Sequence, residues 1–369
     1  MKKISIRQTA FVLILLLISM RVIIEPSFMF SVAGKDGFAS YLIGFLIQVV
    51  GIVFIALLIK NNPNKKFSEI CEQAFGKAIT KIIMVLFFAF FALKITGIDF
   101  EVQNFLLEVF YEKLYSKIFL IPFFLVIVYV SLKGPRIFAR LSEVFLPFGV
   151  FVLFYTLIIA IGNAKMINLL PIFADGAKPF INGTAYGVSQ MGEFLALFFL
   201  MENVEIKRKE KAVTIFIIVA IVFSIFMTGF YLLFVAVFGN ASITLNEGII
   251  RMTQFSTSLN INFRIDGLSA VMWLPLNVIL LCVNFYCAGK TIQYIFDIKL
   301  NFAILIVFVL FFIVKFMPAI SSNVIFNFEI NYFIYVSVFL QIILPALLFI
   351  IIKIKKGKSY EKNFKFPAW

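Results

Sequence analysis

Apolar stretches alternate with short polar connections along nearly the whole of the 369-residue chain. About 20 apolar residues in an α-helix cross the hydrocarbon core of a bilayer, whereas a membrane β-barrel shows strictly alternating segments of about ten residues. The continuous apolar runs therefore predict an all-α polytopic membrane protein with ten transmembrane helices. The predicted spans cover residues 10–32, 39–59, 80–99, 117–132, 144–162, 184–203, 212–238, 267–288, 301–318 and 333–353.

Lysine and arginine gather in every second connection between these spans. The largest groups lie in residues 60–81, 133–140 and 207–211 and in a basic tail at 354–369. Because cytoplasmic connections carry an excess of lysine and arginine, both termini are predicted to be cytoplasmic. This orientation turns the net charge of +14 toward anionic lipid, so the lipid bilayer and not nucleic acid is the expected partner of these charges.

The composition agrees with a membrane protein and excludes several kinds of chemistry. Hydrophobic residues make up 62% of the chain and charged residues 14%, and the mean hydropathy is +1.05. A soluble domain has about 25% charged residues. Histidine is absent, which excludes Ser-His-Asp catalysis and histidine metal sites. No enzymatic activity, metal or cofactor is expected, and Cys71, Cys282 and Cys287 are expected to be buried free thiols.

One cytoplasmic connection, residues 65–78, has the pattern of an amphipathic helix. Phe67, Ile70, Cys71 and Ala74 recur at helical spacing on one face, and charged and amide side chains occupy the other. A helix of this kind is expected to lie on the membrane surface. Nothing else in the sequence indicates a separate soluble domain, so we expect a single transmembrane domain.

Predicted span 1 contains Ser19, Arg21, Glu25 and Pro26, and ionisable groups are costly at this depth. Arg21 and Glu25 are four residues apart on one helical face. One interpretation is an ion pair that neutralises itself on a helix kinked by Pro26. The other interpretation is a ligand-binding site beside a discontinuous helix.

Predicted span 6 opens with glycines, small hydroxyl side chains and a carboxylate. Among them are Gly187, Ser189, Gly192 and Glu193. Glycines in a membrane helix often mark close helix packing. Glu193 is therefore interpreted either as a structural partner of another helix or as a group that binds ligand. Breaks that face each other are expected at about residues 19–26 in span 1 and 187–193 in span 6, with Pro26 and the glycines, Gly187 among them, as the local cause.

Two further charged residues, Lys94 and Asp99, lie near the outer end of predicted span 3. Long lysine side chains near helix ends often extend to the membrane interface. The alternative is a role for Lys94 and Asp99 in coupling or gating.

Spans 1 and 6 are the first helices of two predicted halves, at residues 10–162 and 184–353. Interrupted helices at corresponding places in two halves point to a transporter binding site near the membrane midplane. In this interpretation Arg21 binds a carboxylate through its planar guanidinium, and Glu193 binds an ammonium group. The two residues would then hold both ends of a zwitterionic amino acid.

A set of short motifs, weak one by one, follows a recognisable order along the chain. They are Ile4-Ser5 with Gln8, Pro63 with Gly76-Lys77, Gly134, Arg140-Leu141, Pro147, Asn168-Leu169-Leu170-Pro171, Gly192-Glu193 and Pro345. In order and spacing they resemble the spore germination permease family, the B subunits of Ger-type nutrient germinant receptors. That family belongs to the amino acid–polyamine–organocation transporter superfamily. The resemblance implies a five-plus-five inverted-repeat transporter fold with broken helices 1 and 6.

The resemblance also implies a function. It indicates a subunit of the spore inner membrane that binds a small germinant, in the simplest case an amino acid. Its expected partners are an A-type membrane subunit and a C-type lipoprotein subunit of the receptor. The alternatives are a proton-coupled amino-acid permease and a packing subunit with a vestigial pocket. Members of the family commonly have small residues where this chain has Ser19 and Arg21, so Arg21 either binds a carboxylate or fills the pocket.

Overall fold

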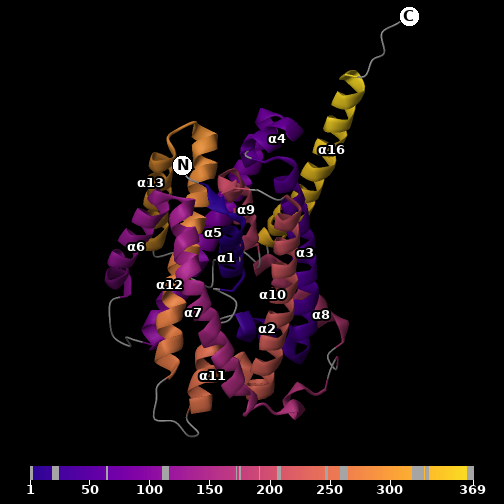
Figure 1. Ribbon diagram of the computed structural model, residues 1–369. Coiled ribbons are helices and arrows are strands. Elements are labelled where there is room, and N and C mark those ends of the chain that lie inside the picture. Colours follow the sequence, from indigo (N-terminus) through magenta and orange to yellow (C-terminus); the bar gives the residue numbers. More distant parts are fainter. Residues whose placement is uncertain are drawn as a thin grey trace, which may run out of the picture.

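The described part of the chain is almost entirely helical (Figure 1). The computed structural model describes residues 3–18, 25–63, 65–109, 116–171, 173, 176–190, 192–205, 209–245, 248–257, 265–317, 328 and 332–363. The helices are α1 (Ile6–Ile18), α2 (Glu25–Ala33), α3 (Gly37–Asn61), α4 (Phe67–Phe75), α5 (Lys77–Val109), α6 (Ser116–Lys133), α7 (Pro135–Ile161), α8 (Ala177–Gln190), α9 (Ala196–Leu200), α10 (Lys209–Phe238), α11 (Gly248–Thr257), α12 (Ile265–Phe296), α13 (Leu300–Phe316), α15 (Ile334–Val338) and α16 (Leu344–Asn363).

Shorter elements join these helices. They are the 3-10 turns η1 (Gly34–Asp36), η2 (Met166–Leu169), η3 (Glu193–Leu195), η4 (Met201–Asn203) and η5 (Gly239–Ile243), the π-helical turn η7 (Phe339–Ile343), and the strands β1 (Ile4–Ser5) and β2 (Val204–Glu205). The two strands pair in parallel, with Ile4 opposite Val204. This pairing joins the start of predicted span 1 to the segment that follows predicted span 6.

Six segments of the described chain are long and apolar enough to cross a membrane. They are Pro26–Asn61, Lys77–Gln103, Pro135–Ile161, Ala212–Ile243, Val271–Phe296 and Ile334–Lys355. Three shorter apolar helices cover Ile6–Ile18, Ile121–Lys133 and Leu300–Phe316. The all-helical membrane class predicted from the sequence is therefore confirmed, while the count of ten spans and the inverted repeat stay predictions.

Helix α12 is the most deeply buried of the six candidate spans. Its most apolar window is 72% buried, against 28–50% in the other five. It packs against α5, α6, α7 and α13, and the Phe285 and Phe308 rings stack at 3.8 Å between α12 and α13. A helix that is apolar on all sides is typical of such an enclosed position.

The amphipathic helix predicted between spans 2 and 3 is α4. The spacing correctly predicted the helix and its apolar face, but Phe67, Ile70, Cys71 and Ala74 are buried against the protein, with the Phe67 ring stacked on Phe198 of α9 at 4.2 Å. The expected position on the membrane surface stays a prediction. Gly76 ends the helix with φ +83°, a conformation that glycine adopts without steric cost, and α5 begins at the next residue. Helices α4 and α16 lie in contact at one end of the bundle, and α11 lies at the opposite end (Figure 1).

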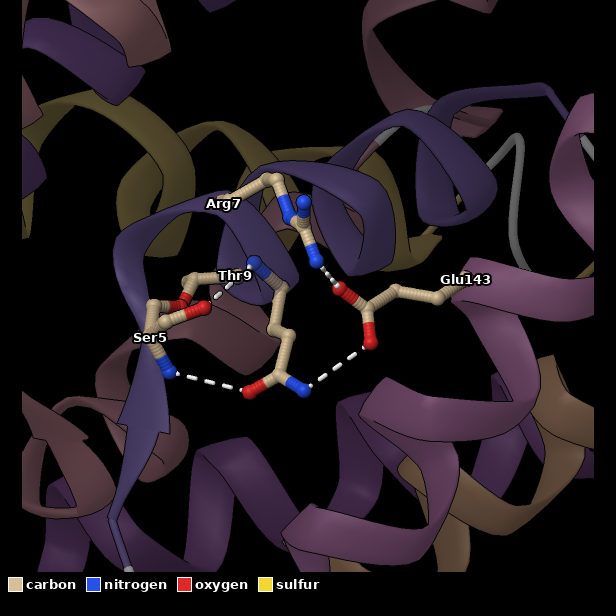
Figure 2. A network of polar contacts seen from close by, with 5 residues as sticks. Ser5, Arg7, Thr9 and Glu143 are labelled. Carbon is tan, nitrogen blue, oxygen red and sulfur yellow. Dashed lines mark hydrogen bonds and ion pairs between the residues drawn. The ribbon is translucent and has the colours of Figure 1, made fainter.

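The start of α1 is held by a network of polar contacts (Figure 2). The Ser5 hydroxyl accepts the Gln8 N–H at 3.2 Å, and the Gln8 side chain accepts the Ser5 N–H at 3.0 Å, which is the reciprocal arrangement of a capping box. The carboxylate of Glu143 on α7 accepts hydrogen bonds from Arg7 and Gln8, both at 2.9 Å. The network thus links α1 to the cytoplasmic end predicted for α7.

Candidate ligand-binding site

Predicted span 6 is interrupted at Gly192. Helix α8 ends at Gln190, Gly192 has φ +128° and ψ 0°, and η3 begins at Glu193. A Cβ atom at residue 192 would lie 2.8 Å from the Gln341 Nε2 atom and 2.9 Å from the Phe90 ring. The break lies within the range 187–193 predicted from the sequence, at its far end, because the helix continues through Gly187 to Gln190. Both the positive φ and these close neighbours therefore disfavour any residue other than glycine at position 192.

Gln341 compensates part of the cost of this interruption. Carbonyl groups at the end of a helix lack partners within the helix, and in a membrane protein they need partners from elsewhere. The Gln341 side chain, which is fully buried in the π-helical turn η7, donates a hydrogen bond to the Val188 carbonyl at 3.0 Å. Gly51 of α3 lies directly against the Gln341 backbone, where a larger residue would not fit. The broken helix is thus enclosed by α3, α5 and η7.

A buried ion pair lies beside the break. The Lys94 ammonium of α5 is 3.4 Å from the Glu193 carboxylate, and the two residues are only 8% and 4% exposed. The same ammonium lies 5.8 Å from the centre of the Phe90 ring. Charged groups at this depth need a partner or water. Lys94 therefore points into the bundle and does not extend to the interface, and an ammonium group meets Glu193 from within the protein.

A second buried ion pair lies further along α5. The Asp99 carboxylate accepts hydrogen bonds from the Lys315 ammonium of α13 at 2.7 and 2.9 Å and from the Gln103 amide at 2.7 Å. Asp99 is 2% and Lys315 9% exposed. The Lys315 ammonium also lies 4.7 Å from the centre of the Phe124 ring, a distance typical of a cation–π contact.

Lys315 was not among the candidate residues predicted from the sequence. The signal was its helical spacing, because Ala303, Val307 and Phe311 are all buried on α13 and Lys315 continues this row at the next fourth residue. A lysine on the buried face of an apolar helix requires a carboxylate on a neighbouring helix. Asp99 was named as a candidate for coupling or gating without its partner.

Helix α5 presents its two ion pairs to different neighbours. Lys94 and Asp99 are five residues apart, which corresponds to well over one helical turn and about 7.5 Å along the axis. Lys94 therefore meets η3 on one side of the helix, while Asp99 meets α13 on another. One helix connects the break in span 6 to α13.

The candidate site is described in part on the span 1 side. Ser19 and Arg21 lie outside the described residues, as do the side chains of Glu25 and Ser189. Helix α1 ends at Ile18, α2 begins at Glu25, and the buried Pro26 is in the first turn of α2, where its missing N–H costs nothing. Helix α1 contacts η3 and α2 contacts α8, so predicted spans 1 and 6 are neighbours. The break expected at 19–26 falls mostly on residues outside the described part of the chain.

Comparison with known proteins decides the family. The family model described as "Spore germination protein" matches residues 3–324. The chain belongs to the spore germination protein family. The family predicted from the sequence is therefore confirmed, and the match covers both ion pairs and the break at Gly192.

Two curated members of the spore germination protein family come from Bacillus subtilis (strain 168). The spore germination protein YndE is 24% identical over 279 residues, which cover 72% of this chain and 73% of YndE. The putative spore germination protein YfkT is 25% identical over 277 residues, which cover 71% of each chain.

A solved structure supports the fold. The crystal structure described as MhsT in complex with L-phenylalanine is similar over 93% of this chain and 97% of the MhsT chain, with a TM-score of 0.58 and 12% sequence identity. The similarity shows that this member of the spore germination protein family has a transporter-type fold.

Proposed function

We propose that the chain is a membrane subunit of a spore nutrient germinant receptor and that it binds a small germinant, in the simplest case an amino acid. The observation that carries the proposal is the buried Lys94–Glu193 ion pair beside the break at Gly192. Membership of the spore germination protein family and a transporter-type fold, seen in MhsT with L-phenylalanine bound, support the same proposal.

The ion pair suits a zwitterionic ligand. The 3.4 Å separation between Lys94 and Glu193 is longer than the 2.7–2.9 Å of a strong charge-assisted hydrogen bond. An amino acid brings one ammonium and one carboxylate, so it replaces one loose ion pair by two and leaves no buried charge alone. Arg21 also belongs to the proposed site, where its guanidinium would bind the carboxylate of the amino acid.

Ligand binding can act as a signal if Lys94 and Glu193 are in contact in one conformation of the helix bundle and separated in another. A ligand shifts an equilibrium between conformations only by its difference in affinity for them. In the proposed mechanism the ligand binds the conformation in which Lys94 and Glu193 are separated. The A-type and C-type subunits of the receptor then sense this conformation.

The proposal includes the membrane topology expected from the sequence. The single domain has ten spans in two repeats, at residues 10–162 and 184–353, with a cytoplasmic tail at 354–369, in the spore inner membrane. The contact between α4 and α16 at one end of the bundle supports a common side for residues 65–78 and the tail (Figure 1).

The test is a germination assay in spores whose own gene is replaced by a variant. Each common amino acid is supplied singly, and germination is measured as loss of optical density. Glu193→Gln is expected to abolish the response to the amino acid that the parent recognises. Because this change removes the carboxylate that faces the buried Lys94 ammonium, the double variant Lys94→Gln/Glu193→Gln, which removes both charges of the pair, is tested beside it.

The matched control is Glu205→Gln, which makes the same chemical change at an exposed residue of β2. It is expected to respond like the parent. Protein levels are measured by immunoblot of spore membranes. If the double variant accumulates normally and responds to the same amino acid with the same sensitivity, the Lys94–Glu193 pair is structural and the proposed site is wrong.

The second candidate function is a proton-coupled amino-acid permease, which the transporter-type fold favours. Glu193 or Asp99 would then carry the coupled proton. Flux of labelled amino acids into proteoliposomes under a pH gradient separates the two functions. Saturable binding without flux supports the receptor, and accumulation driven by the gradient supports the permease.

A further inference from the structure

A pocket of about 300 Å³ opens at the α4 end of the bundle, far along α5 from the Lys94–Glu193 pair. Its apolar floor is formed by the buried side chains of Phe67, Met84 and Phe199. Helices α4, α5 and α12 supply most of its wall. The volume is large enough for a phosphate group together with the small polar group to which it is esterified.

Basic side chains dominate the rim of this pocket. Lys66, Lys77, Lys81 and Lys290 line it. Lys290 pairs with Glu202, so these two charges cancel. The other three lysines are exposed, and none has an ion-pair partner among the described residues.

The acidic residues of the pocket balance only part of this charge. Glu72 accepts a hydrogen bond from the Tyr294 hydroxyl, and Asp297 is exposed just after the end of α12. Without the Lys290–Glu202 pair, the pocket is lined by three lysines and two carboxylates, so the net charge of its lining is positive.

The N-terminus of α5 adds to the positive potential. Helix α5 has 33 residues and begins at Lys77, so the free N–H groups of its first turn and the positive end of the helix dipole lie at the end of the helix that borders the pocket. Lys77 and Lys81 lie in its first two turns. The Ser68 hydroxyl, in the first turn of α4, is a further hydrogen-bond donor on the wall.

The pocket also lies at the level expected for phosphate groups of a membrane. The predicted span 80–99 begins next to Lys77 and Lys81 on the same helix, so the predicted membrane surface lies near the pocket. Helix α4 borders the pocket at the same end of the bundle. Basic side chains at this level attract anionic lipid.

We infer that this pocket binds a phosphate group, through Lys66, Lys77, Lys81, Ser68 and the N-terminus of α5. The phosphate group belongs either to the headgroup of an anionic phospholipid or to a soluble phosphate ester. The inference concerns a site separate from the proposed germinant site, and it does not depend on the proposed function.

The experiment uses the full chain in lipid nanodiscs of phosphatidylcholine, with two probes. One arm titrates phosphatidylglycerol into the discs, and the other adds glycerol 1-phosphate in solution. Native mass spectrometry counts the bound probe and gives the dissociation constant. Saturation in the lipid arm alone assigns the site to a headgroup, and saturation by glycerol 1-phosphate as well assigns it to soluble phosphate esters.

The decisive variant is Lys77→Gln/Lys81→Gln. Each lysine near an anionic surface contributes a factor of about five to affinity, so the double variant is expected to bind the probe about tenfold to thirtyfold more weakly. Lys299→Gln/Lys353→Gln is the control, because it removes two exposed lysines that do not line the pocket.

The control is expected to retain the parent's affinity. Equal weakening in the two double variants would show a general charge effect and overturn the inference. Absence of saturable binding in both arms would also overturn it. All four substituted lysines are exposed, and the unfolding temperature of each variant verifies that it remains folded.

Discussion

The conformation of Gly192 leads to a quantitative prediction for Gly192→Ala. At φ +128° a residue with a side chain is strained, at a cost of about 1–3 kcal/mol. The added methyl group would also lie 2.8 Å from the Gln341 side chain and 2.9 Å from Phe90, and overpacking of this kind costs about 1–3 kcal/mol. Because Gln341 and Phe90 adjust in part, we expect a total loss of about 2–4 kcal/mol in the free energy of unfolding.

The chain contains its own reporter for this measurement. Cys71, Cys282 and Cys287 are free and buried, and burial raises the pKa of the Cys71 thiol, so a thiol-reactive dye labels these residues when the protein unfolds. The dye's fluorescence during heating gives the unfolding midpoint. Unfolding has an entropy of about 2.1 cal/mol/K per residue, or roughly 0.8 kcal/mol/K for the 369 residues, so we expect the midpoint of Gly192→Ala to fall by roughly 3–5 °C.

Gly97→Ala and Gly229→Ala are the matched controls. Both glycines lie inside helices, and an added Cβ atom at either meets nothing within 4 Å. Alanine is favoured over glycine in a helix by about 0.5–1 kcal/mol, so these midpoints are expected to stay or rise. If Gly192→Ala unfolds at the same temperature as the two controls, the break in span 6 does not depend on glycine at this position.

Three further predictions concern the remaining ion pairs and the topology. Asp99→Asn leaves the Lys315 ammonium buried without its carboxylate and is expected to cost about 3–5 kcal/mol in thermal unfolding, with Asp99→Asn/Lys315→Gln recovering most of the loss; no recovery would refute the coupling. Arg7→Ala removes a pair with Glu143 in which Arg7 is exposed, and the same assay is expected to show a change of at most about 1 kcal/mol, a larger loss contradicting this. A cysteine at Ser359, in the C-terminal part of α16, is expected to resist an impermeant thiol reagent added from outside, and labelling from that side would show that the tail is not cytoplasmic.

Hydropathy and periodicity were sufficient to predict the helical membrane class, because burial in lipid acts on whole segments. The amphipathic helix at 65–78 was predicted from spacing alone, and its apolar residues Phe67, Ile70 and Cys71 are buried against the protein. Its place on the membrane surface stays a prediction. In both cases the property that determines the structure is local to the segment, so the sequence of that segment contains it.

The details of the candidate site depend on contacts between segments far apart in the chain. Gly187 and Gly192 both lie in the predicted break at 187–193, and only the backbone of Gly192, with φ +128°, departs from the helix, where Gln341 and Phe90 pack closely against it. The partner of Glu193 likewise comes from another helix, in the form of Lys94. A single sequence gives the cost of a buried charge but not the helix that compensates it. The proposed pairing of Arg21 with a ligand stays a prediction.

Helix α5 gives these observations a mechanical meaning. It runs without interruption from Lys77 to Val109, a length of about 50 Å for 33 residues. It borders the basic pocket at its first turns, meets the broken span at Lys94 and binds α13 through Asp99. Because an α-helix hardly stretches along its axis, a sliding movement of Lys94 would be shared by the other two places at the same moment. The rigidity of α5 thus couples the basic pocket, the Lys94–Glu193 pair and the Asp99–Lys315 pair, so that they move together.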